Sequence, residues 1–321
     1  MPDLSQSAHE SLNSAKALAT LPVSGGCGLC QVRAEPQNES KRLHVMTNTV
    51  DLSSLDPESD DFGSELVRLI NKAGYLVISN MDFDIGDVDS CSDKLLAFCR
   101  LFADPIPHNP DPNSLIWDIK AVTGQNSELA TFSEVTECAE LHTDNAFAAH
   151  PDDFFCLLSL KAASCGGGES TLLNVTDIID ELRSTPEGRE AEQILRTKPY
   201  PFAVPSIFQD ERIEGHECNT GLVLIDDCIR FRTDVIEDSI AHRPDLVDDS
   251  QIKALNLLTD IIAKSAAIQR VMLNPNELII IDNKRLLHGR EAFEDTSRHL
   301  LRVRLRERPA LSSDLNAPRA A

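Results

Sequence analysis

The sequence predicts a mainly β protein with flanking helices, built as a β-sandwich or jelly roll. After Pro105 and Pro107 the chain consists of short apolar runs separated by turn residues, a pattern typical of strands. Helical patterns interrupt these runs too irregularly for a doubly wound parallel sheet, in which strands and helices alternate. The 321 residues, 41% of them hydrophobic, are enough to bury a core between two sheets with helices outside.

The first predicted elements precede this region. Apolar side chains at helical spacing predict a helix over residues 64–73, with Ser64 as its N-cap and Gly74 ending it. A strand is expected over residues 75–78 and a second helix over residues 92–102.

The later apolar runs predict six strands, at residues 115–119, 154–160, 170–175, 221–225, 277–282 and 300–305. Two helical inserts are expected at about residues 177–183 and 251–268, where apolar residues recur at helical spacing. The glycines at 166–168 lack the Gly-Lys-Ser/Thr ending of a phosphate-binding loop, so they predict a tight turn before a strand.

The two ends of the chain are expected to lie outside the folded domain. Residues 1–47 are rich in turn-forming residues and predict an extension, flexible or acting as a lid. Residues 48–310 are expected to form a single domain with helical inserts, followed by a tail at 311–321. Cys27 and Cys30 are compatible with a zinc or redox motif, but no second Cys-x-x-Cys follows, which favours two thiols in a mobile arm.

The excess of acidic residues limits the classes of partner that this protein is expected to bind. Thirty basic and 52 acidic residues give a net charge of -22, which disfavours nucleic acid and anionic membrane surfaces. The nine cysteines are odd in number and several lie in apolar runs, as in proteins of a reducing compartment. No apolar run is long enough to cross a bilayer and no secretory signal is evident, so the sequence predicts a cytoplasmic protein.

The segment at residues 140–145, Glu-Leu-His-Thr-Asp-Asn, carries the most chemistry. On an extended chain His142 and Asp144 lie on one face, so both can approach one metal ion. Two imidazoles and one carboxylate on one face of an octahedron are the ligand set of non-haem Fe(II) oxygenases. The expected third ligand is His288, which follows the predicted strand at 277–282 and a turn.

A strand rich in arginine begins ten residues after His288. Alternation at residues 300–305 places leucine and valine on one face and arginine on the other. Arginines that point into a sheet interior need anionic partners, because an unpaired buried charge is costly. Arg298 and Arg302 share a face about 13 Å apart, at roughly 3.3 Å per residue, so we expect them to bind different anions.

Together these motifs resemble the Fe(II)- and 2-oxoglutarate-dependent oxygenases of the taurine dioxygenase and clavaminate synthase-like superfamily. The matching pieces are Leu-His-Thr-Asp at 141–144, Gly-Gly-Gly-Glu-Ser-Thr at 166–171, Asn-Lys-Arg-Leu-Leu-His-Gly-Arg at 283–290 and Arg-x-x-x-Arg at 298–302. The resemblance covers about residues 50–306 and implies a double-stranded β-helix core.

The resemblance also implies roles for single residues. His142, Asp144 and His288 would bind Fe(II) and be the catalytic residues, and Arg298 and Thr171 would bind the co-substrate 2-oxoglutarate. Arg302 matches a position that faces the acidic group of the substrate in several relatives. Whether Arg298 or Arg302 is the 2-oxoglutarate clamp stays open, because the segment after His288 is shorter than in clavaminate synthase-like relatives.

Three further residues bear on the substrate pocket. In similar amino-acid oxygenases the stretch around Ser133 contacts the α-amino acid, and a segment like residues 230–234 contributes an acidic residue, here Asp234. A turn cap for Ser133 and a solvated carboxylate for Asp234 are the competing interpretations. Trp117 lies in an apolar strand and is expected in the core.

The implied reaction consumes O2 and 2-oxoglutarate, releases succinate and carbon dioxide, and hydroxylates an unactivated carbon. The expected substrate is a small amino acid, free or carrier-tethered, or an amino-acid-derived metabolite of specialised metabolism. Alternatives are a desaturase or cyclase on the same scaffold, a catabolic sulfonate or aryloxy-acid dioxygenase, and a non-catalytic jelly-roll binding protein.

Overall fold

A computed structural model describes residues 48–109, 111–121, 134–205 and 217–308. The chain divides into the units Met1–Pro36 and Gln37–Ala321, and all described residues belong to the second. The predicted N-terminal extension with Cys27 and Cys30, the C-terminal tail and the candidate Ser133 lie outside the described residues. The domain boundaries expected from the sequence therefore stay predictions.

The larger sheet has seven strands and is antiparallel except for its first pair. Its order is β1 (Thr49–Asp51), β2 (Tyr75–Ser79), β13 (Leu278–Asp282), β6 (Phe154–Lys161), β15 (His299–Glu307) and β3 (Ala103–Ile106), with β4 (Trp117–Lys120) also paired to β15. The long strand β15 thus has β6 along one edge and both β3 and β4 along the other.

The smaller sheet is a four-stranded antiparallel sheet in the order β12 (Gln269–Val271), β7 (Ser170–Asn174), β14 (Leu286–Arg290) and β5 (Ala139–His142). One apolar cluster joins the two sheets: Phe155 and Ile279 of the larger sheet pack with Leu172 and Leu286 of the smaller one. The two sheets therefore pack face to face, as sheet sandwiches do.

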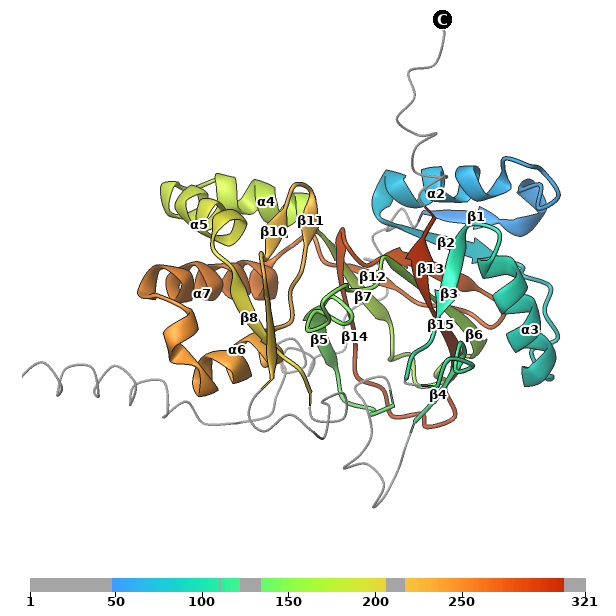
Figure 1. The fold of residues 1–321 in the computed structure, drawn as a ribbon. Helices are drawn as coiled ribbons and strands as arrows, with labels where there is room; N and C mark the ends of the chain where they lie inside the picture. Colours follow the sequence, from blue (N-terminus) through green and yellow to red (C-terminus); the bar gives the residue numbers. More distant parts are fainter. Residues whose placement is uncertain (1–47, 110, 122–133, 206–216, 309–321) are drawn as a thin grey trace, which may run out of the picture. The chain divides into compact units, whose positions relative to one another are not determined.

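Helices cover the outer face of each sheet (Figure 1). Helices α2 (Phe62–Ala73) and α3 (Val88–Cys99) share an apolar cluster with the larger sheet. A second cluster joins the smaller sheet to α4 (Val175–Arg183), α5 (Pro186–Thr197), α6 (Thr233–His242) and α7 (Asp249–Lys264). Short connecting elements are the 3-10 turns η3 (Leu52–Ser54) and η6 (Pro244–Leu246) and the strands β8 (Tyr200–Ala203), β9 (Cys218–Gly221), β10 (Leu224–Ile225) and β11 (Cys228–Ile229).

Most predicted elements are present with shifted ends. Gly74 ends α2 in the left-handed conformation at φ 80°, as its lack of a side chain allows. Helix α2 begins two residues before the predicted Ser64, and its N-cap position is Asp61. Helix α3 begins four residues before its predicted start, where Asp87 accepts a hydrogen bond from the backbone N–H of Ser90.

Two helices, α5 and α6, were absent from the prediction. Helix α5 carries a readable start signal, because Thr185 caps it and Pro186 occupies its first turn. Helix α6 has no side-chain cap, and its apolar side chains Val235 and Ile236 are buried by the neighbouring helices and strands. Tertiary packing therefore defines this helix.

The predicted fold class holds at the level of a sheet-rich domain with helices outside. On β15, Leu301, Val303 and Leu305 face the cluster under α2 and α3, as the alternation predicted. Consequently Arg302 and Arg304 face the space between the sheets. Among the described residues no helix is both long and apolar enough to cross a membrane.

Candidate active site

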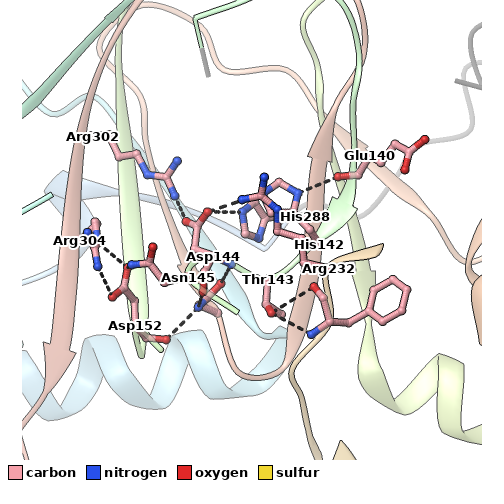
Figure 2. A network of polar contacts seen from close by, with 12 residues as sticks. Glu140, His142, Thr143, Asp144, Asn145, Asp152, Arg232, His288, Arg302 and Arg304 are labelled. Atoms are coloured by element: carbon pink, nitrogen blue, oxygen red, sulfur yellow. Dashed lines mark hydrogen bonds and ion pairs between the residues drawn. The ribbon is translucent and has the colours of Figure 1, made fainter. Parts of the chain in front are cut away.

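Strand pairing brings His142 and His288 together although 146 positions separate them. They are direct partners in the pairing of β5 with β14, and their ring centroids lie 4.5 Å apart. Asp144 follows in the turn after β5, with its Oδ1 3.6 Å from His142 Nε2 and 3.4 Å from His288 Nε2. One ligand atom from each of the three residues lies within 4.8 Å of the others. The predicted ligand set therefore converges (Figure 2).

The backbone around Asp144 is held by two distant segments. The N–H of Thr143 donates to the carbonyl of Phe231 at 2.7 Å, and the Phe231 N–H donates to Thr143 Oγ1 at 3.0 Å. The side chain of Asn283, 1% exposed, accepts from the Asp144 N–H at 2.7 Å and donates to the Asp144 carbonyl at 3.1 Å. Thr143 therefore points away from His142 and Asp144.

Both imidazoles are prepared to act as neutral ligands. His142 Nδ1 lies 2.7 Å from the carbonyl oxygen of Glu140, which only accepts, so Nδ1 carries the proton and Nε2 presents its lone pair. Burial is the main cause that lowers the pKa of His142 to about 4. Burial, and then the nearby His142, hold the pKa of His288 well below its usual value. Both rings are therefore neutral at pH 7.

His288 provides a test of whether this site fits a metal ion. Within the described part of the chain His288 Nε2 makes no hydrogen bond, although the residue is only 7% exposed. A buried polar atom without a hydrogen bond is costly, so its presence calls for an explanation. A divalent cation held by the two imidazoles and the Asp144 carboxylate would satisfy this nitrogen, and this donor set suits Fe(II).

Arg302 reaches the same carboxylate from β15. Its Nη2 contacts Asp144 Oδ2, and its guanidinium lies 4.4 Å from the Phe155 ring and 5.7 Å from the Trp117 ring. Burial, and then the charge of Arg304, lower the pKa of Arg302 to about 9, so it is a cation at pH 7. Trp117, expected in the core, is only partly buried, and it stacks on His108 at 5.6 Å beside Arg302.

Arg298 lies at a separate small pocket whose lining comes from both sheets. The pocket is lined by Ser159, Ala162, Ala163, Gly168, Ser170, Met272, Leu273, Arg298 and Leu300. Arg298 is 9% exposed, and burial, then the charge of Arg290, lower its pKa to about 10. Among described residues Ser159 Oγ has no hydrogen-bond partner. A cation and a hydroxyl at one buried pocket are suited to binding a carboxylate.

The sequence matches a protein family described as taurine catabolism dioxygenase TauD, TfdA family, over residues 37–304. The chain belongs to this family. No curated protein matches the sequence. Solved structures share the fold. An asparagine oxygenase in complex with Fe(II), 2S,3S-3-hydroxyasparagine and succinate is 20% identical, with a TM-score of 0.60 over 79% of this chain and 84% of that one.

A second similar structure is the non-haem iron oxygenase OrfP in complex with Fe, succinate and (3S)-hydroxy-L-Arg. It is 21% identical, with a TM-score of 0.58 over 81% of this chain and 83% of that one. At these identities the similarity shows a common fold. The TauD/TfdA family and this fold agree with the resemblance seen in the sequence.

The geometry does not support the role expected for Thr171. Thr171 pairs with Gly289, on the face of the smaller sheet that carries Leu173 and Leu287 toward the outer helices. His288 is next to Gly289 on β14 and therefore points to the opposite face of the sheet. Ser170 shares that inner face and lines the Arg298 pocket, while Thr171 does not. The structure thus places Ser170, and not Thr171, on the face that carries His288, because of the register of β7 against β14.

Asp234 lies in the first turn of α6, with half of its side chain exposed. Both of its oxygens accept from Arg232, at 2.8 Å each. Asp234 is close enough for its charge to raise the pKa of His142, while burial is the larger, opposing cause. The sequence interpretation singled out Asp234 and left its partner Arg232 unassigned.

Proposed function

We propose that this chain is an Fe(II)- and 2-oxoglutarate-dependent oxygenase that hydroxylates an unactivated carbon of a small amino acid or an amino-acid-derived metabolite. One observation carries the proposal: His142, Asp144 and His288 converge from two strands and a turn, and the buried Nε2 of His288 makes no hydrogen bond to a described residue. Membership in the TauD/TfdA family supports it. The two packed sheets support the finer assignment of a double-stranded β-helix core.

In this proposal His142, Asp144 and His288 would hold Fe(II), and the coordination positions that they do not fill would be available to the co-substrate and O2. When bound, the iron and 2-oxoglutarate supply the oxidising chemistry, with loss of carbon dioxide and formation of succinate. The protein supplies position and charge. His142 keeps its Nε2 directed inward through the hydrogen bond to Glu140, and Asn283 holds the backbone of Asp144.

We assign the distal carboxylate of 2-oxoglutarate to the Arg298 pocket. Arg298 is a buried cation without a hydrogen bond from its guanidinium to any described residue, whereas Arg302 already contacts Asp144. Ser170 takes the place expected for Thr171, and Ser159 adds a second hydroxyl. The opposite assignment, with Arg302 as the clamp, would leave a buried cation at 298 without an anion.

We assign the carboxylate of the amino-acid substrate to Arg302. Its guanidinium is fixed between Phe155 and Trp117, so it is held in one orientation toward the metal ligands. The asparagine oxygenase and OrfP structures contain hydroxylated amino acids, which supports an amino acid as the substrate class. The substrate is proposed to be free or carrier-tethered.

We also propose a reducing, cytoplasmic location. Seven cysteines of the described residues are free, and three of them, Cys91, Cys99 and Cys156, are buried. Buried free thiols persist where reductants keep cysteines unpaired.

The test is spectroscopic and kinetic. Anaerobic addition of Fe(II) and 2-oxoglutarate should give a weak visible charge-transfer band, and aerobic addition of the right amino acid should release succinate in step with hydroxylated product. His288→Ala should lose the band, while His242→Ala, a histidine on the exposed side of α6, should keep it. Absence of the band together with absence of coupled succinate release on all amino acids tested would refute the proposal.

A further inference from the structure

Asp152 is a buried carboxylate that the proposed chemistry does not use. The residue is only 1% exposed, and it lies between the turn that carries Asp144 and the start of β6. Both of its oxygens accept from the guanidinium of Arg304 on β15, at 2.6 Å from Nε and 2.8 Å from Nη2. Burying a carboxylate is costly unless a cation and hydrogen bonds compensate it, and Arg304 provides both.

The ion pair of Asp152 with Arg304 is better suited to fixing a position than to adding stability. Desolvation of two buried charges offsets much of their attraction, so a pair of this kind is weak evidence for stability. A guanidinium that donates through two nitrogens accepts only one orientation of the carboxylate. Asp152 is therefore fixed against β15, the strand whose Arg302 contacts Asp144.

From this fixed position Asp152 contacts both residues that support Asp144. Its Oδ2 accepts from the side-chain amide of Asn145 at 3.0 Å (Figure 2). Its backbone carbonyl accepts from the side-chain amide of Asn283 at 2.9 Å. Asn145 directly follows Asp144 in the chain, and Asn283 binds the N–H and the carbonyl of Asp144. One buried residue thus links the two supports of a metal ligand.

Asn145 requires a support because of its backbone conformation. Its φ of 49° lies in the left-handed region, which residues other than glycine adopt rarely and at a cost in free energy. Asparagine tolerates this conformation better than most residues, and surrounding contacts stabilise it. Residues 144–147 form a turn after β5, so the conformation of Asn145 affects the direction in which the Asp144 side chain leaves the backbone. The hydrogen bond to Asp152 therefore acts on a metal ligand.

The two acids also divide the two arginines of β15 between them. Arg302 and Arg304 are two residues apart on one strand, so they share a face at roughly 7 Å along it. Asp144 contacts Arg302, and Asp152 binds Arg304. Without the charge of Asp152, the cation at Arg304 would compete with a metal ion for the negative charge of Asp144.

We infer that Asp152 is a positioning residue for the metal ligand Asp144, acting through Asn145 and Asn283 and held in place by Arg304. This role rests on the proposed function, because it requires that Asp144 binds the metal ion. Replacing a residue that orients a metal ligand typically weakens metal binding by about 10- to 100-fold. The same range is expected at Asp152, although it is not one of the three ligands.

Calorimetric titration of the full-length, metal-free protein with Mn(II) tests this role. Asp152→Asn keeps the shape of the side chain and removes the charge that binds Arg304, so Mn(II) affinity should decrease by about 10- to 100-fold. Asn145→Gly removes the amide that donates to Asp152, while glycine adopts the same φ without strain. Its Mn(II) affinity should decrease by about 3- to 10-fold. Asn145→Gly leaves the ion pair intact, so it tests the role even if Asp152→Asn does not fold.

Asp153→Asn is the matched control. Asp153 is the next residue, and its carboxylate also binds β15, through Arg306 at 3.3 Å and the backbone N–H of Glu307 at 3.0 Å. It contacts Asn283 through its backbone carbonyl, which the substitution keeps. The Mn(II) affinity of this variant should therefore match that of the wild type.

The visible spectrum separates positioning from a general loss of structure. With saturating Fe(II) and 2-oxoglutarate in the absence of O2, Asp152→Asn should shift the wavelength of the charge-transfer band, because one iron ligand is displaced. The 2-oxoglutarate concentration that gives half of the band should stay unchanged, because the Arg298 pocket is separate. A variant that is only less stable would lose band intensity without a shift.

Three results would overturn this role: wild-type Mn(II) affinity in both Asp152→Asn and Asn145→Gly, an equal loss of affinity in Asp153→Asn, or a loss of affinity with an unshifted band. In each case the proposed function stands, provided that the wild-type protein binds Mn(II) and forms the band. If the wild type does neither, the proposed function is refuted, and the role of Asp152 with it.

Discussion

Arg302 and Asp144 are in contact across the two sheets. The guanidinium of Arg302 meets Oδ2 of Asp144, while both imidazole Nε2 atoms face Oδ1 of the same carboxylate. Each oxygen of Asp144 thus has a different role, one toward a cation of the protein and one toward the metal site. A substrate carboxylate bound at Arg302 would therefore lie next to the metal ligands, where hydroxylation has to occur.

Arg298, just before β15, and Arg302, within β15, should each affect the KM of a different substrate. Arg298→Gln should raise KM for 2-oxoglutarate by about 10- to 100-fold, because it removes a charge-assisted carboxylate contact, with a small effect on the amino-acid KM. Arg302→Gln should raise the amino-acid KM by a similar factor. Initial rates with each substrate varied in turn provide the measurement. The reverse pattern would make Arg302 the clamp.

The offset between Ser170 and Thr171 is open to a paired test. Ser170→Ala should raise KM for 2-oxoglutarate by about 3- to 10-fold, since it removes one neutral hydrogen bond at the Arg298 pocket. Thr171→Val keeps the shape and removes the hydroxyl on the opposite face, so it should leave this KM unchanged. A larger effect for Thr171→Val than for Ser170→Ala would restore the role first expected for Thr171.

Metal affinity should depend on His288 far more than on other histidines. His288→Ala should weaken Mn(II) binding by more than about 100-fold, since it removes one of three protein ligands. Calorimetric titration of the purified protein measures the affinity. His242→Ala, on the surface of α6, should match the wild type. Equal Mn(II) affinity of the His288→Ala protein would place the metal elsewhere.

The lowered histidine pKa values predict two pH effects of known sign. Above pH 5 the folded protein keeps His142, with a pKa of about 4, and His288 neutral, so Mn(II) affinity should stay nearly constant from pH 7.5 to 5. The unfolded chain takes up protons at an ordinary pKa of about 6.5, so the free energy of unfolding of the metal-free protein should decrease as pH falls from about 6.5 to 4.

Mn(II) titrations at several pH values measure the first effect, and denaturant unfolding of the metal-free protein over the same pH range measures the second. A midpoint of Mn(II) release near pH 6.5 would show that the two imidazoles are not held neutral.

Gly289 is required for the approach of β14 to β5. A Cβ at this position would lie 2.5 Å from the Ala139 carbonyl oxygen and 2.7 Å from Thr171 Oγ1. Gly289→Ala should therefore cost about 1 to 3 kcal/mol of stability and weaken Mn(II) binding, because the strands that carry His142 and His288 must separate. Gly86→Ala, where the nearest atom is 3.4 Å away, is the control. Thermal unfolding with and without Mn(II) distinguishes the two variants.

Several features of the site were readable in the sequence because they depend on local spacing. Alternation along an extended chain placed His142 and Asp144 on one side of Thr143, and separated Leu301 and Val303 from Arg302 on β15. The same rule puts Ser170 and Thr171 on opposite faces of β7, but only the pairing of β7 with β14 showed which of them faces inward. Helix α5 also carried its start signal in Thr185 and Pro186. Local geometry and capping act within a few residues, so the order of residues is enough to reveal them.

Other features arose only from the packing of distant segments. The contact of Arg302 with Asp144, the pairing of His142 with His288 and the hydrogen bonds of Phe231 with Thr143 all join residues far apart in the chain. Strand register and sheet packing decide such contacts, and both are cooperative properties of the whole core. The residue types thus indicated a metal and a co-substrate, whereas the tertiary structure decided that Arg302 contacts Asp144 and that Arg298 lines a separate pocket, because electrostatic contacts depend on distance in space and not on distance along the chain.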